Sequence, residues 1–396
     1  MRAWRRPLLV AALSIAFAGP ASAQQPPDPE IQRAFVEGAQ RLEAGDFESA
    51  ARIFRELTQK TDSPRVKLEL ARALFYLKQY RESRRLFKAV LLEPELPWRV
   101  HDNIEAFLRS IDEVDGYARF ALSVVSDSNP RNITQERQFT IGGVRLTFDP
   151  PHDNERVTGL RYSFQAMEPI LRESRVSVYF NASYLDYPSQ SLDRLTADGG
   201  LSKRLGASYA ELRAGMEGGT FGGQYLYRFP YLELSNRLSE STVHRLDGAV
   251  RVGRVTFPYY TYLDANYGSV TLSLARSMTQ ALAGLLKATV ELSNARERPY
   301  SYYGVTLEPG INLFVERPAP LLLRAGVAFG HRQYAADDPL FGVTRRDSRI
   351  ALEASLRNKE WRWMNFTPAL AMTLERNDST IDFYSYRKAN VYLVLE

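Results

Sequence analysis

The stretch RVSVYFNASY, from Arg175 to Tyr184, alternates polar and apolar side chains at every position. A period of two indicates a β-strand, because successive side chains of a strand point to opposite faces of the sheet. The same alternation recurs in ELRAGME, from Glu211 to Glu217, and in LKATVELS, from Leu286 to Ser293. These runs carry full charges on their polar face and reach about 10 to 14 residues, whereas strands of soluble sandwiches average about five or six. The pattern therefore predicts a membrane β-barrel, which is apolar outside and polar inside.

Alternating segments continue from Tyr117 to the last residue, Glu396, and we assign residues 115–396 to a 14-stranded antiparallel barrel. The first strand is expected from Tyr117 to Val125. The others are expected to begin near Val157, Ser174, Leu195, Ala207, Gln224, Val243, Asp264, Leu282, Ser301, Leu321, Arg346, Met364 and Arg387. An even number of strands is what a closed bacterial barrel needs, and short turns alternate with longer loops along this series.

The longest loop follows the first strand and covers residues 126–156. Within it, QFTIGGVRLTFD, from Gln138 to Asp149, has the composition of a strand but would break the alternation of turns and loops. We expect this segment to belong to the loop, where it could fold into the lumen as a plug.

Residues 1–23 are expected to be a secretory signal peptide. They combine the basic residues Arg2, Arg5 and Arg6 with an apolar run and the small-residue sequence ASA at 21–23. Their removal takes three arginines and no acidic residue from a formal net charge of +5. The remaining chain is close to neutral, which gives no reason to expect a nucleic-acid partner. Residues 24–30 form a Pro-rich linker.

Residues 31–114 have helical periodicity and match themselves at a spacing of 33 residues, so that Gly38 aligns with Ala71 and Phe47 with Tyr80. This segment resembles the tetratricopeptide repeat, best in its second unit, Leu68 to Pro94, and residues 98–114 would cap the stack. Helical repeats form concave surfaces that bind peptides, so we predict client-binding residues in this head. They are Leu74, Tyr80 and Phe87. The alternative is a helical hairpin with no ligand of its own.

The sequence predicts no catalytic, cofactor-binding or metal-binding residue. It has no cysteine, and its four histidines are scattered with no pair at metal-binding spacing. One enzymatic alternative is an outer-membrane hydrolase that uses His331 beside Asp337 and Asp338. The glycine-rich stretch GMEGGTFGGQ, from Gly215 to Gln224, lacks the lysine of a phosphate-binding loop and is expected to be an outer loop.

Charged residues on the polar faces of the predicted strands are expected to line the lumen, where they would hydrate it and pair with one another. These residues are Glu211, Arg213, Lys287, Glu291, Arg324, Glu353 and Arg357.

Three stretches of the predicted barrel carry a resemblance to a known family. They are SVVSDSNP at 123–130, DPLFGVTRRDSRIALEASLRNKEWRW at 338–363 and FTPALAMTLERNDSTIDFYSYRKANVYLVLE at 366–396. Together with a short helical-repeat head, they resemble the surface lipoprotein assembly modulator (Slam) family of Gram-negative outer-membrane proteins. The resemblance implies an outer-membrane protein with a periplasmic head, which moves client polypeptides, typically lipoproteins, to the cell surface. It implies no nucleotide and no metal.

The leading hypothesis is therefore a translocator, not an enzyme, whose partners are a client polypeptide, outer-membrane lipids and the barrel-assembly machinery. Two alternatives stay open. The chain could secrete a soluble client in place of a lipidated one, or it could be a passive porin whose helical head is a scaffold.

Overall fold

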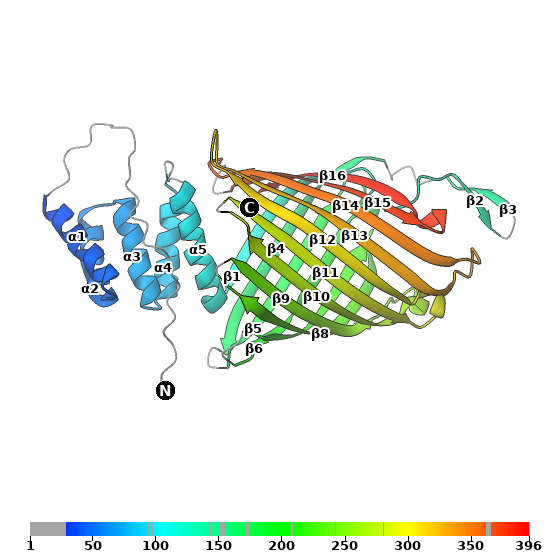
Figure 1. Ribbon diagram of the computed structural model, residues 1–396, viewed down its shortest axis with the longest axis horizontal. Helices are drawn as coiled ribbons and strands as arrows, with labels where there is room; N and C mark the ends of the chain where they lie inside the picture. Colours follow the sequence, from blue (N-terminus) through cyan, green and yellow to red (C-terminus); the bar gives the residue numbers. More distant parts are fainter. Residues whose placement is uncertain are drawn as a thin grey trace. The chain divides into compact units, whose positions relative to one another are not determined.

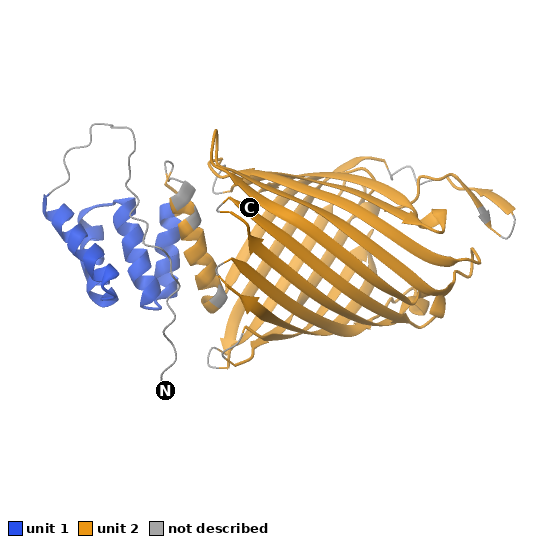
Figure 2. Ribbon diagram, in the orientation of Figure 1, with its two compact units in different colours: residues 1–90 blue, residues 91–396 orange. Residues whose placement is uncertain are grey.

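The computed structural model describes residues 29–93, 96, 98–141, 144–149, 155–171, 174–206, 209–241, 243–279, 281–361 and 366–395. The predicted signal peptide, 1–23, and nearly all of the linker, 24–30, lie outside these residues. The chain divides into two compact units, residues 1–90 and 91–396 (Figure 2). Each unit is described here by itself. Among the described residues, no helix combines the length and the hydrophobicity that crossing a membrane requires.

The first unit is a stack of antiparallel helices. Its helices are α1 (Pro29–Glu43), α2 (Phe47–Lys60), α3 (Pro64–Tyr76) and α4 (Tyr80–Leu91), whose last residue already belongs to the second unit. Two aspects of the sequence explain the packing. Gly38 lies against Phe54, and a Cβ atom at Gly38 would come within 2.9 Å of the Phe54 ring. Ser83 is fully buried, and its hydroxyl donates a hydrogen bond of 2.8 Å to the carbonyl of Ala71. Small residues therefore stand where the helices approach most closely, as the 33-residue repeat predicts.

Asp46 caps α2. Its carboxylate accepts a hydrogen bond of 3.2 Å from the backbone N–H of Ser49, which has no partner inside the helix. This hydrogen bond, aided by Arg41 at 3.3 Å, lowers the pKa of the Asp46 carboxyl below its ordinary value.

The second unit begins with α5 (Trp98–Asp115), which a single residue, Gly116, joins to the first barrel strand. Gly116 has a φ of +79°, a conformation that residues with a Cβ rarely adopt. A Cβ atom there would also meet the Pro169 side chain at 2.8 Å and collide with the carbonyl oxygen of Met167. An ion pair of 2.7 Å between Arg119 and Asp112 spans the same junction. Glycine is therefore required at this position.

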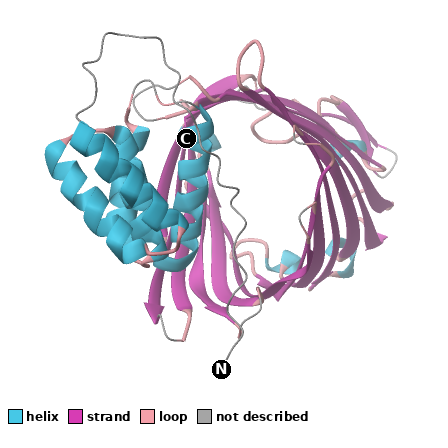
Figure 3. Cartoon of the chain, turned by 60° about the vertical axis from the view of Figure 1, so that its left-hand side comes forward, coloured by secondary structure: helices cyan, strands magenta, loops and turns pink. Residues whose placement is uncertain are grey.

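Fourteen antiparallel strands close into a barrel (Figures 1 and 3). They are β1 (Tyr117–Asp127), β4 (Val157–Leu171), β5 (Val176–Asp186), β6 (Arg194–Arg204), β7 (Glu211–Phe221), β8 (Gln224–Glu240), β9 (His244–Val255), β10 (Ala265–Ser277), β11 (Leu282–Ala295), β12 (Tyr302–Val315), β13 (Leu321–Asp337), β14 (Thr344–Asn358), β15 (Pro368–Ser379) and β16 (Tyr386–Leu395). Each strand pairs with its neighbour in the chain, and β1 closes the ring against β16, from Leu122 opposite Leu395 to Asp127 opposite Asn390.

We call the end of the barrel where β1 finishes, away from α5, the distal rim. Its loops include short 3₁₀-helices, which are η2 (Gln190–Leu192), η3 (Thr261–Leu263), η4 (Arg298–Tyr300) and η5 (Asp382–Tyr384). The first loop contains a two-stranded hairpin, β2 (Gln138–Ile141) and β3 (Val144–Thr147). Phe139 and Phe148 beside this hairpin pack on Phe383 of η5, with ring centroids 5.5 and 5.8 Å apart.

The fold confirms a helical-repeat head followed along the chain by a 14-stranded barrel. Each barrel strand begins within four residues of its predicted start. Two details differ. The glycine-rich stretch from Gly215 is mostly part of β7, and only Gly222 and Gly223 form the turn. The β2–β3 hairpin extends beyond the strand ends (Figure 1), because its aromatic residues are held at the rim. The described residues of this loop are therefore not a lumenal plug.

The cap at Asp46 makes the helical unit sensitive to acid. A carboxyl whose pKa is lowered by folding stabilises the fold above its unfolded pKa and loses that effect as the pH falls through its folded pKa. We expect the thermal midpoint of the helical circular-dichroism signal at 222 nm to fall below about pH 4. In Asp46→Asn, which keeps an acceptor oxygen, this fall should be smaller. Glu48→Gln, in the same helical turn, is the control, and an unchanged pH profile in Asp46→Asn would contradict the assignment.

Candidate functional site

The inner face of the barrel is identified by side chains that touch across strands that are not neighbours. Arg251 on β9 reaches Glu217 on β7, and Tyr179 on β5 reaches Tyr231 on β8. Side chains converge only on the concave side of a curved sheet, so these residues point into the lumen. The alternate positions carry large exposed apolar residues, as expected for the outer face of a membrane barrel. Examples are Leu232, Leu234, Val250, Val252, Val270, Leu272, Val290 and Leu292.

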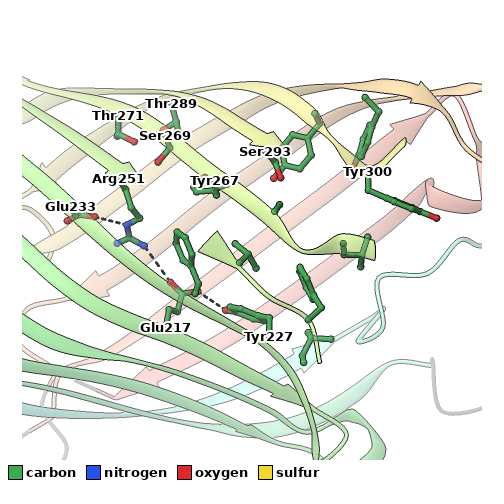
Figure 4. Close-up of a pocket in the computed structure, with 18 of the residues that line it drawn as sticks. Glu217, Tyr227, Glu233, Arg251, Tyr267, Ser269, Thr271, Thr289, Ser293 and Tyr300 are labelled. Carbon is green, nitrogen blue, oxygen red and sulfur yellow. Dashed lines mark hydrogen bonds and ion pairs between the residues drawn. The ribbon is translucent and has the colours of Figure 1, made fainter. Parts of the chain in front are cut away.

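Arg251 is the centre of one charged network on this inner face (Figure 4). Its Nε donates to Glu233 at 2.7 Å, and its Nη1 lies 3.5 Å from Glu217. The hydroxyl of Tyr227 donates to the second oxygen of Glu217 at 2.6 Å. Both carboxylates therefore have a charged partner, and strands β7, β8 and β9 are tied together from the inside.

Tyrosines extend this network toward β5 and β6. The Tyr231 hydroxyl donates to Asp198 at 2.7 Å and lies 2.8 Å from the Tyr179 hydroxyl. The guanidinium of Arg251 stands 4.3 Å from the ring centroid of Tyr231, and that of Arg213 stands 5.4 Å from that of Tyr179. Each arginine thus pairs with a carboxylate and also stacks on an aromatic ring, an arrangement that its planar fork allows.

The same construction recurs on the opposite part of the wall. Arg332 donates to Glu291 at 2.7 Å and stacks 4.8 Å from the Tyr302 ring. Arg349 donates to Glu375 at 2.9 Å, and this carboxylate also accepts from the Tyr386 hydroxyl at 2.6 Å.

Several cavities open on this inner face. One of them, about 860 Å³, has aromatic side chains from β8 to β13 on its wall and charged groups from β7, β8, β9, β11 and β14. Between them, β10 and β11 contribute small hydroxyl groups, which are Ser269, Thr271, Thr289 and Ser293 (Figure 4). The second cavity, about 570 Å³, is lined by Arg245, Asp247, Lys287, Glu308, Arg324 and Glu353 among others.

The structure brings some of the predicted lumen residues together and leaves others apart. Arg213 lies 2.9 Å from Glu211 and 3.9 Å from Glu233. Lys287 pairs with Glu308 at 2.9 Å, and Glu291 pairs with Arg332.

Arg324 and Glu353 share the smaller cavity, but among the described residues neither makes a side-chain hydrogen bond or ion pair. Among the described residues, Glu211 and Arg213 meet the expectation that predicted residues pair with one another. Arg357 lies on β14 opposite Leu322.

The structure corrects the predicted client-binding residues of the head. Leu74 and Phe87 are fully buried in the helical core, so their side chains are not available to a ligand. They were predicted from the helical spacing of apolar residues, but this spacing is the same for residues of a buried core and for residues that line a groove. Tyr80 is half-buried and lies beside Phe75, with ring centroids 5.9 Å apart. The exposed aromatic residue of this cluster is Tyr76, which also stacks on Phe47 at 4.6 Å.

The arrangement of the remaining candidates does not assemble a reactive centre. His331 lies 3.3 Å from the Ser348 hydroxyl, whereas Asp338 accepts a hydrogen bond from Tyr384 at 3.1 Å. In the part of the chain that the structure describes, no group of three or more acidic or histidine residues could hold a metal ion.

Comparison with known families assigns both units. Residues 231–396, from β8 to the end of the barrel, match the family described as surface lipoprotein assembly modifier. Residues 41–95 match the tetratricopeptide repeat. The combination places the protein in the outer membrane, with an N-terminal repeat domain followed along the chain by a transport or assembly barrel. A search of curated protein sequences finds no match.

Solved structures that resemble this barrel include outer-membrane proteins of low similarity. They include OccAB4 of Acinetobacter baumannii, with 9% identity, a TM-score of 0.39 and coverage of 71% of this chain and 97% of that one. OmpT of Vibrio cholerae has 8% identity, a TM-score of 0.36 and coverage of 71% and 99%. A bacterial polysaccharide outer membrane secretin has 9% identity, a TM-score of 0.36 and coverage of 70% and 98%.

Several inner-face residues of the barrel were not predicted. They are the carboxylates, arginines and aromatic rings that complete the networks, namely Asp198, Glu217, Glu233, Arg251, Tyr231, Tyr302, Arg332, Glu375 and Tyr386. Each stands on the polar phase of its strand, so extending the alternation along every strand would have found them. Their pairing depends on the register between neighbouring strands and between strands two apart, which the alternation does not give.

The central position of Arg251 makes it a test of the network. Arg251→Met should leave Glu217 and Glu233 without their shared cation and lower the free energy of unfolding by about 1–2 kcal/mol, since these groups are partly exposed. Arg324→Met, which removes an inner-face arginine with no described partner, should change it by less than about 0.5 kcal/mol. Urea unfolding in detergent, followed by the heat-dependent gel shift of the folded barrel, measures both. Equal effects of the two substitutions would refute the network.

Proposed function

We propose that this protein is a translocator that delivers client proteins across the outer membrane to the cell surface. In this proposal the helical unit stands in the periplasm and captures the client, and the barrel passes it outward or guides its assembly. One observation carries the proposal. The same chain contains a helical repeat of a type that binds peptides and a barrel that matches the surface lipoprotein assembly modifier family.

The chemistry of the inner face supports passage of a polypeptide. Most of its charges are neutralised by neighbours on the same wall, as with Arg251 and Glu233 or Arg332 and Glu291. Such a surface is hydrated but presents few strong, uncompensated charges to a passing chain. The hydroxyl groups of Thr271 and Thr289, 3.2 Å apart, could bond to the backbone of any sequence. We infer that the barrel acts by conduction and guidance, with no catalytic step.

The class of client follows from the family. We propose surface lipoproteins as the clients, because the family is described by their assembly. A secreted soluble client would also have to be captured as an extended chain. It differs from a lipoprotein client only in lacking the lipid anchor. The outer partners would be outer-membrane lipids around the apolar face, and barrel-assembly machinery would insert the protein.

Site-specific photocrosslinking in intact cells tests the proposal. A photoreactive residue at Tyr76, exposed on the head, and another at Lys287, on the wall of both cavities, should trap the same surface or secreted polypeptide. A probe at Leu74 is the matched control, because this buried position should form no adduct with a client. Mass spectrometry of the adduct identifies the client and shows whether it carries lipid.

Two results would contradict a translocator. One is an empty lumen at Lys287 with adducts only to cell-wall or barrel-assembly proteins at Tyr76. The other is a steady, large conductance in planar bilayers without client dependence, which would indicate a passive porin with a helical scaffold.

A further inference from the structure

Two arginines stand in one row of the inner wall near the distal rim. The register places Arg161 of β4 opposite Leu185 of β5, and Leu185 opposite Arg194 of β6. The row continues to Phe221 of β7. Neighbouring strands are about 4.8 Å apart, so the Cα atoms of the two arginines are roughly 10 Å apart on the same face. Leu185 between them is buried, and both guanidinium groups therefore share one patch of wall.

Both arginines lack the acidic partner that other inner-face cations of this half of the barrel possess. Arg251, Arg332, Arg345, Arg349 and Lys388 each have a carboxylate within 3.0 Å. In the described structure the side chains of Arg161 and Arg194 make no ion pair and no hydrogen bond, and each guanidinium stands over an aromatic ring. Arg161 stands 5.1 Å from the Tyr392 centroid and Arg194 stands 5.0 Å from that of Phe221.

The hydrogen bonding of Arg194 is visibly incomplete. Its Nε is buried and has no acceptor. A buried donor without a partner is costly, more so on a charged group, and such atoms are rare in folded proteins. The local residues therefore hold this cation in place without neutralising it.

One carboxylate near this patch, that of Asp127, already has several partners. Asp127, at the end of β1, accepts from the Asn129 N–H at 2.9 Å and from the Tyr187 hydroxyl at 3.0 Å. It also pairs with Lys388 at 3.0 Å and is almost completely buried. It can neither turn toward the two arginines nor bind an incoming ligand.

A third arginine lies beside this patch. Arg131, in the loop after β1, stands 5.7 Å from the centroid of Phe221, the ring that Arg194 also contacts. Its Nη2 donates to the Ser191 hydroxyl at 3.0 Å, which fixes the guanidinium over the patch.

We propose that Arg161 and Arg194, with Arg131 above them, form an oxyanion-binding site for a carboxylate or phosphate group presented from the lumen. A guanidinium binds either group through two parallel hydrogen bonds, and its donors here are held by rings that do not compete for them. The site faces the lumen, so the head group of a surrounding lipid cannot reach it. The ligand is then a free oxyanion or the acidic side chains of a polypeptide in the lumen. The site does not rest on the proposed translocation.

Calorimetric titration of the purified full chain, in an uncharged detergent at low ionic strength, tests this site. The probes are inorganic phosphate and a hexaglutamate peptide. We expect at least one of them to bind, and the double variant Arg161→Gln/Arg194→Gln to weaken that binding at least about tenfold. Raising the salt concentration should weaken it as well, because salt screens charges that face water.

The matched control is Arg324→Gln, which removes an inner-face cation that lines the 570 Å³ cavity and should change the affinity by less than about twofold. Arg161→Lys and Arg194→Lys keep the charge but not the planar fork, and each should weaken binding even if the double variant fails to fold. Binding of hexaglutamate far above that of phosphate would identify a polypeptide as the source of the anion, and binding of phosphate alone a small oxyanion. Absence of binding of both probes, or equal binding by the double variant, would overturn the proposal.

Discussion

The backbone hydrogen bonds between β1 and β16 are the contact on which the barrel depends. Lipid offers no hydrogen-bonding partner, and each unpaired backbone group inside a membrane costs several kcal/mol, so a spanning sheet must have no free edge. Closure also fixes which phase of each strand points inward. The alternation first seen in Arg175 to Tyr184 therefore separates an apolar outer face from a charged inner face only because the first and last strands meet.

Closure also allows the inner face to neutralise itself. Arg251 can serve Glu217 and Glu233 at once because the curvature brings β7 to β9 together on the inside. Tyrosine hydroxyls fill the remaining acceptor positions, as Tyr227 does on Glu217. Many of the charges on such a wall are neutralised locally, and Arg161 and Arg194 differ because two unpaired arginines share one patch.

Strand positions were predictable from the sequence to a useful degree, and interactions were not. The starts of β8 at Gln224 and β11 at Leu282 are as predicted, because alternation and turn residues are local signals. The pair formed by Arg213 and Glu233 depends on strand register, which only the closed sheet defines. Leu74 was misassigned because burial and exposure share one helical periodicity. The arginine patch has no sequence signature at all, since its members come from separate strands and a loop.

The one-residue connection at Gly116 makes the junction between α5 and β1 a fixed joint. A flexible tether would let the helix turn independently of the sheet, but here the left-handed backbone, the close approach of Met167 and Pro169, and the Arg119–Asp112 ion pair leave little freedom. Any torque applied to α5 would therefore pass directly into β1, one of the two strands that close the ring. Mechanical load on the helix and integrity of the barrel seam are coupled through a single glycine.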